Sequence, residues 1–433
     1  MSSSPPATIA GRYRIALDRQ LGEGGQGQVF EAFDDADKRS CAVKLLSALI
    51  ALCALTVVVV LGVSAFGGSG TAGVRDWIPK AADFLAFYTG GVILASGHGD
   101  RLYDRHMYRR TQDRIADSDV KYHAVYPPPL YQAMTLVRPL GYERAAQLFL
   151  VGQALLVLLA ASLMVLAIPE LGAWSRPAIG LVAFSPFAVM NVMTGQGAGL
   201  WLTLLASGIL LLRRGRPVLA GMVLGVLCAK PSIALAVAAF ITLSGQWRAL
   251  LGFAAGGATV LAASLVAHGP EPWIAWAEWM RSPAAGTFWP MPERQMTWRT
   301  LFGWPLRATQ LGTWATPAAA ALGALAAIPL VKRAWRLDPA DPRWPLRAGL
   351  LLSLLILCLP HMIEYDAGTH ALLGLGIAAA LRPALGQGAW ALVALWLAPV
   401  LFPLSAVTHV ALGPLAVTAA LFAGARHARQ LRN

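Results

Sequence analysis

Charged residues are scarce in this chain. Lys, Arg, Asp and Glu make up 13% of its 433 residues, and 57% of the residues are hydrophobic, whereas soluble globular proteins carry about 25% charged residues. This composition excludes an ordinary soluble domain and favours a helical membrane protein. The net charge of +13 forms no basic stripe, because the arginines stand beside the apolar runs. We therefore interpret it as a topology signal rather than as a nucleic-acid-binding surface.

Cysteines are also few, and their positions exclude two common uses of this residue. Cys41 precedes the first apolar run, whereas Cys53, Cys228 and Cys358 lie within apolar runs. None forms a C-x-x-C pair, and none lies in the long loop after the first run, so neither a zinc site nor a disulfide framework is indicated. We expect all four to be packing residues.

Long apolar runs dominate the rest of the sequence. They recur from residue 45 almost to the C-terminus, separated by short loops rich in Arg, Pro and Gly. We predict an all-α polytopic protein with about twelve transmembrane helices, within a range of roughly ten to thirteen. The predicted spans are 45–66, 146–168, four short or tilted helices within 179–243, then 249–267, 312–331, 346–360, 367–381, 388–402 and 409–423. The first run starts far behind a polar segment and is long enough to span, so we expect no cleavable signal peptide.

The short loops differ in positive charge. With a cytoplasmic N-terminus, the inside loops and the C-terminal tail carry fourteen Lys and Arg residues, against five in the outside loops after the long first one. The positive-inside rule then predicts that both termini are cytoplasmic. We expect the protein to lie in the cell membrane. Two large segments, 67–144 and 268–309, lie outside. The stretch 81–95 is expected to lie flat in the interface as a short helix, and the Trp-rich second segment along the membrane surface.

A glycine-rich motif stands near the N-terminus. Gly22, Gly24 and Gly27 form G-x-G-x-x-G, and Lys44 closes A-V-K at the spacing of a lysine that holds nucleotide phosphates. This segment resembles the first three strands of a bacterial serine/threonine protein kinase. The chain has no H-R-D-x-x-x-x-N and no D-F-G. We therefore expect 1–44 to be a poorly ordered cytoplasmic fragment that binds no nucleotide, and 45–433 to form the membrane domain.

Polar groups at the ends of apolar runs are the candidates for chemistry, because charges are costly at membrane depth. Asp83 opens D-F-L-A-F-Y and is either a solvated or capping residue, or a general base whose pKa burial raises. Gln196 in T-G-Q-G suits a turn with an interhelical hydrogen bond. Lys230, before Pro231, is either a snorkelling lysine or a partner of a lipid phosphate.

Three further places carry polar groups. Tyr126 precedes three prolines, which we predict to be non-helical. Arg299, among interfacial Trp residues, is a headgroup anchor or a phosphate ligand. Several ionisable residues lie near the outer end of the predicted span 346–360. They either belong to an ordinary loop or form a polar wall that faces a lipid-linked substrate. They are His361, Glu364, Tyr365 and Asp366.

In their order, these motifs resemble glycosyltransferase family 87, the polyprenyl-phosphate-mannose-dependent mannosyltransferases of the GT-C fold. The resemblance runs from about Asp83 to Asp366. It is carried by D-F-L-A-F-Y-T-G-G, Y-P-P-P-L, T-G-Q-G, R-R-G-R-P-V-L-A-G-M-V-L-G-V-L-C-A-K-P and P-H-M-I-E-Y-D. The arginine-proline to A-G-x-x-x-G to K-P run is the most distinctive of these.

The resemblance implies an inverting transfer of a sugar, with mannose expected, from a polyprenyl-phosphate donor to a lipid or glycan acceptor at the extracytoplasmic face. Asp83 corresponds to the family's catalytic acidic residue and would take the proton from the acceptor hydroxyl. The candidates for holding the donor phosphate are, in decreasing order, Lys230, Arg299 and His361. The other substrate-binding candidates are Gln196, Tyr126, Tyr365 and Asp366.

The expected partners are the lipid-linked donor, the acceptor and membrane lipids, without nucleic acid. No cofactor is indicated, and a requirement for a divalent metal is left open. A transporter or flippase is the first alternative, which the near absence of acidic residues from span interiors disfavours. A membrane-anchored kinase or nucleotide sensor and a structural scaffold are weaker alternatives.

Overall fold

In the computed structural model, the chain divides into two compact units, Met1–Leu55 and Thr56–Asn433. The structure describes residues 8–9, 13–24, 27–34, 82–116, 122–282, 291–306, 338–380 and 385–430, and isolated positions between 309 and 329. Lys44, Cys41, Cys53 and the predicted span 45–66 lie outside the described residues.

The first unit contains a small antiparallel sheet of order β1-β2-β3. Its strands are β1 (Thr8–Ile9), β2 (Tyr13–Gly24) and β3 (Gly27–Asp34). Gly24 pairs with Gly27 where β2 turns into β3, so the glycine-rich motif lies at the end of a hairpin. The resemblance to a kinase stays a prediction for this segment.

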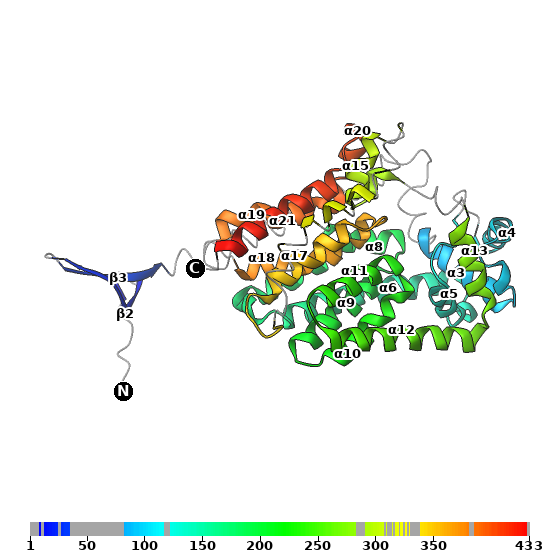
Figure 1. Cartoon of the computed structure of the whole chain (residues 1–433), viewed down its shortest axis with the longest axis horizontal. Coiled ribbons are helices and arrows are strands. Elements are labelled where there is room, and N and C mark those ends of the chain that lie inside the picture. Colours follow the sequence, from blue (N-terminus) through cyan, green and yellow to red (C-terminus); the bar gives the residue numbers. More distant parts are fainter. Residues whose placement is uncertain are drawn as a thin grey trace. The chain divides into compact units, whose positions relative to one another are not determined.

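In the second unit, the described residues form helices joined by loops, together with one isolated β-bridge between Gln295 and Ile363 (Figure 1). Its first helices are α3 (Ala82–Ala95), α4 (Arg105–Ile115), α5 (Pro128–Thr135), α6 (Tyr142–Leu166), α7 (Ser175–Ala183), α8 (Pro186–Thr194), α9 (Ala198–Arg213), α10 (Pro217–Gly225), α11 (Pro231–Leu243) and α12 (Trp247–His268). The remaining helices are α13 (Glu271–Arg281), α15 (Trp298–Leu306), α17 (Trp344–Leu357), α18 (Ala371–Ala380), α19 (Leu385–Leu397), α20 (Phe402–Thr408) and α21 (Leu412–Gln430).

Within the described residues, three helical segments are long and apolar enough to cross a membrane: Tyr142–Leu166, Ser175–Thr194 and Trp247–His268. A fourth would be the pair Trp390–Val400 and Phe402–Thr408, which is bent by 75°. The other predicted runs in this part of the chain coincide with shorter helices, several of which begin at a proline. A proline starts a helix well but cannot continue one, so it divides a long apolar run into shorter helices. The protein is a helical membrane protein, and its count of about twelve spans stays a prediction.

Helices α10 and α12 lie side by side (Figure 1) and pack together through glycines. Gly221 and Gly225 on α10, and Gly252 and Gly256 on α12, form one small-xxx-small motif on each helix. A Cβ atom added to any of the four would lie 1.9–2.4 Å from a carbonyl oxygen of the facing helix. The backbones are therefore in direct contact, as in closely packed membrane helices.

Helix α3 is a core helix, which corrects the prediction of an interfacial helix over 81–95. Phe84, Leu85 and Ile93 are at most 1% exposed, and the helix contacts α4, α5, α6 and α8. An apolar pattern does not reveal whether lipid or protein covers it, and here protein does.

Two of the three prolines after Tyr126 also differ from the prediction. Pro128 and Pro129 occupy the first turn of α5 and are helical, because the first N–H groups of a helix have no intrahelical partner to lose.

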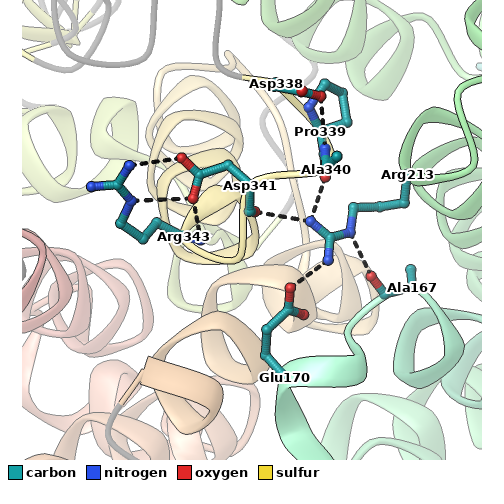
Figure 2. A network of polar contacts seen from close by, with 8 residues as sticks. All are labelled: Ala167, Glu170, Arg213, Asp338, Pro339, Ala340, Asp341 and Arg343. Carbon is teal, nitrogen blue, oxygen red and sulfur yellow. Dashed lines mark hydrogen bonds and ion pairs between the residues drawn. The ribbon is translucent and has the colours of Figure 1, made fainter.

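A polar network around Arg213, at the end of α9, joins segments that are far apart in sequence (Figure 2). Its Nε donates to the carbonyl of Ala167 at 3.0 Å, and its Nη1 donates to the carbonyls of Pro339 and of Asp341, the latter at 3.0 Å. Its Nη2 pairs with Glu170. One guanidinium thus ties the end of α6 and the chain before α17 to α9.

The glycine contact gives a stability prediction. Gly221→Ala is expected to lower the free energy of unfolding by about 1–3 kcal/mol, because the new methyl group forces α10 and α12 apart. Thermal unfolding in detergent measures the change. The matched control is Gly152→Ala on α6, where an added Cβ meets nothing within 4 Å, so stability should be unchanged or higher. Equal stability of Gly221→Ala and the wild type would contradict the packing argument.

Candidate functional site

Asp83 stands in the first turn of α3, and Gln196 holds it. The Nε2 of Gln196 donates to Oδ2 of Asp83 at 2.5 Å. Gln196 reaches this position because Gly195 ends α8 in the left-handed conformation, with φ of 67°, which costs glycine little. The turn predicted at T-G-Q-G thus places an amide donor on the carboxylate.

Tyr126 connects this carboxylate to a lysine. Its hydroxyl lies 3.4 Å from Oε1 of Gln196. The Nζ of Lys230 lies 5.9 Å from the centre of the Tyr126 ring and 5.5 Å from that of Tyr365, within the range of cation–π attraction. Two aromatic faces therefore flank the ammonium group.

Lys230 forms a buried ion pair with Asp366. The lysine is 5% exposed and the aspartate 4%, so the alternative of a lysine that snorkels to water is wrong. Lys230 has an extended backbone between the 3-10 helix η4 (Val226–Ala229) and α11, because Pro231 disfavours helical geometry at the preceding residue. This break turns the lysine into the protein, toward η7 (Glu364–His370).

Arg294 and Glu364 form a second ion pair, which sequence reasoning missed as a pair. Arg294 lies in η5 (Pro292–Arg294), and its Nε donates to Oε1 of Glu364 at 2.8 Å while its Nη2 pairs with the same oxygen. In the sequence, Arg294 is one of the five charges of the predicted outside loops, and no local motif links it to a residue 70 positions away. Only the folded chain shows this contact.

Burial raises the pKa of Asp83 above its ordinary value, although the Gln196 hydrogen bond and the charge of Arg294 both lower it. Burial likewise raises the pKa of the Glu364 carboxyl against the opposing charge of Arg294. A carboxylate with a raised pKa accepts a proton more readily than an exposed one. A raised pKa is what the predicted role of Asp83 as a general base requires.

His361 lies beside the same group of residues. Burial, followed by the charges of Lys230 and Arg299, lowers the pKa of His361 to about 4, so its imidazole is neutral at pH 7. The amide oxygen of Gln295 accepts from the backbone N–H of Met362 at 3.3 Å, which turns the amide nitrogen toward Nδ1 of His361 at 3.0 Å. Since Nδ1 accepts there, the ring proton is assigned to Nε2.

Arg299 contacts the same chain segment, because its Nη1 lies 3.3 Å from the carbonyl oxygen of Pro360. Residues 291–306 are thus joined to the segment after α17 by Arg299, by Gln295 and by Arg294.

The structure brings most of the predicted site residues together. Asp83, Gln196, Tyr126, Lys230 and Asp366 follow one another through direct contacts, with Tyr365 beside the lysine. His361 and Arg299 adjoin this group. The roles of these residues stay predictions. Within the described part of the chain, no three His, Cys, Asp or Glu residues are grouped so as to hold a metal ion.

The sequence model of glycosyltransferase family 87 matches residues 124–360, more than half of the chain. The matched range contains Tyr126, Gln196, Lys230 and Arg294 but not Asp83 or Glu364. A comparison with curated proteins and one with solved structures each found no match.

The buried pair gives a prediction for stability. Lys230→Met leaves the Asp366 carboxylate buried without its cation, which is expected to cost about 3–5 kcal/mol in unfolding free energy. The double variant Lys230→Met/Asp366→Asn removes both charges and should recover most of this loss. Thermal unfolding in detergent measures both. A single variant as stable as the wild type would show that the pair does not hold the two elements together.

Proposed function

Because the chain belongs to glycosyltransferase family 87, we propose that this membrane glycosyltransferase transfers a sugar from a polyprenyl-phosphate carrier to an acceptor hydroxyl. We propose mannose as the sugar, inversion at its anomeric carbon and the extracytoplasmic face of the cell membrane as the place of reaction. The observation that supports the proposal most is the Asp83 carboxylate, buried at the start of α3 and fixed by Gln196.

In the proposed step, a hydroxyl of the acceptor attacks C1 of the sugar. Its oxygen forms the new bond to C1, and its proton passes to Asp83. The bond between C1 and the phosphate oxygen breaks, and the electron pair leaves with the polyprenyl phosphate. Attack from the side opposite the phosphate inverts C1. One base is enough, because a phosphate leaving group needs little protonation.

The phosphate is proposed to bind near Lys230, Arg299 and His361. Arg299 contributes a cation, whereas His361 is neutral at pH 7 and contributes the N–H at Nε2. Lys230 shares its charge with Asp366, so a phosphate would compete with that carboxylate. These groups would then stabilise the negative charge that develops on the leaving oxygen in the transition state, because they are already in position.

The proposed base is tested by Asp83→Asn. An amide cannot take the hydroxyl proton, so the transfer rate should fall by about 10²–10⁴-fold while donor binding persists. Transfer of radiolabelled mannose from polyprenyl-phosphate mannose measures the rate. The matched control is Asp104→Asn, because Asp104 caps α4 by accepting from two backbone N–H groups and asparagine caps equally well. Full activity of Asp83→Asn would exclude Asp83 as the base.

A pH profile tests the role of Gln196. The base acts when it is deprotonated, so kcat/KM should fall as pH falls through the raised pKa of Asp83. The Gln196 hydrogen bond lowers that pKa, and Gln196→Leu should therefore move the acidic limb to higher pH. In Gln132→Leu, which removes an amide bonded to the carbonyl of Ser264, the limb should stay in place. If Gln196→Leu lowers the transfer rate but leaves the acidic limb of the pH profile at the same pH, Gln196 does not change the pKa of Asp83.

A further inference from the structure

Glu364 is a fully buried carboxylate with only one of its oxygens in use. Its exposure is 0%. Both hydrogen bonds from Arg294 end on Oε1, and Oε2 is buried with no hydrogen-bond partner among the described residues. An unsatisfied acceptor of this kind is costly, because folding removes its water without a replacement. Oε2 of Glu364 is therefore open to a hydrogen bond from a ligand, and its place beside the proposed site distinguishes it from other unsatisfied atoms such as Oε2 of Glu170.

The position of Glu364 indicates which ligand. The short helix η7 supplies Glu364 to Arg294 and, two residues later, Asp366 to Lys230. Lys230 is a proposed contact of the donor phosphate, and the sugar is bonded directly to that phosphate. The charge of Arg294 also lowers the pKa of Asp83, the proposed base at C1. Glu364 thus stands among the groups that would surround the sugar ring.

We propose that Oε2 of Glu364 accepts a hydrogen bond from a hydroxyl of the donor sugar and thereby determines which sugar reacts. The inference rests on the proposed function and deepens it. Arg294 has a positioning role, because it fixes Oε1 and leaves Oε2 for the substrate. A sugar without the matching hydroxyl would leave Oε2 buried and unpaired, and buried polar groups discriminate strongly against such analogues.

The experiment compares polyprenyl-phosphate mannose with its 2-, 3-, 4- and 6-deoxy analogues in the wild type and in Glu364→Gln. In the wild type, one analogue should lose about 10- to 100-fold in kcat/KM, the range of a hydrogen bond to a charged group. In Glu364→Gln, the loss for that analogue should shrink by about tenfold, because the charged acceptor is gone. The ratio of the kcat/KM values for two donors, measured with the same preparation, does not depend on how much active enzyme that preparation contains.

The matched control is Glu170→Gln, which changes the carboxylate of the Arg213 network (Figure 2) and should keep the wild-type discrimination. If Glu364→Gln does not fold, the double variant Arg294→Gln/Glu364→Gln, which removes both charges of the pair, takes its place. Equal discrimination in the wild type and the Glu364 variant would overturn the inference, as would a wild type that accepts all four analogues equally. A wild type that transfers sugar from none of the donors would overturn the proposed function, and the inference with it.

Discussion

The requirement that buried charges be neutralised organises this site. Lys230 and Asp366 come from segments 136 residues apart, yet each is almost completely buried against the other. Because either charge alone would be costly in the interior, their pairing fixes η7 to the break between η4 and α11. Tyr126 and Tyr365 close around the ammonium group, and Gln196 extends the chain of contacts to Asp83. The geometry of the proposed base therefore depends on an ion pair that does not contact it.

The glycine contact between α10 and α12 supports the same arrangement. Gly225 is the last residue of α10, and η4 and Lys230 follow directly. With α10 held against the backbone of α12, the start of η4 has little room to shift. The A-G-x-x-x-G to K-P run thus combines a packing motif with the lysine that it positions.

Sequence reasoning located the apolar helices of the described residues, such as α6 and α12, and the family, because hydrophobic runs and ordered motifs are local signals. It named Asp83, Gln196, Lys230 and Asp366 as polar groups at run ends. It did not find the Arg294–Glu364 pair, since the partners lie 70 residues apart in segments without regular spacing. It placed α3 at the interface because the same apolar pattern suits lipid or protein. These failures share one cause, which is that tertiary neighbours decide burial and pairing.

The pairing of cations with carboxylates also suits the proposed chemistry. A phosphate held by several unpaired cations would be bound tightly before and after transfer, which stabilises the ground state and slows release. Among the proposed contacts of the phosphate, Lys230 shares its charge with Asp366 and His361 is neutral at pH 7. Attraction is then strongest when extra negative charge develops on the departing oxygen. An interaction that grows toward the transition state accelerates the reaction, whereas uniform binding does not.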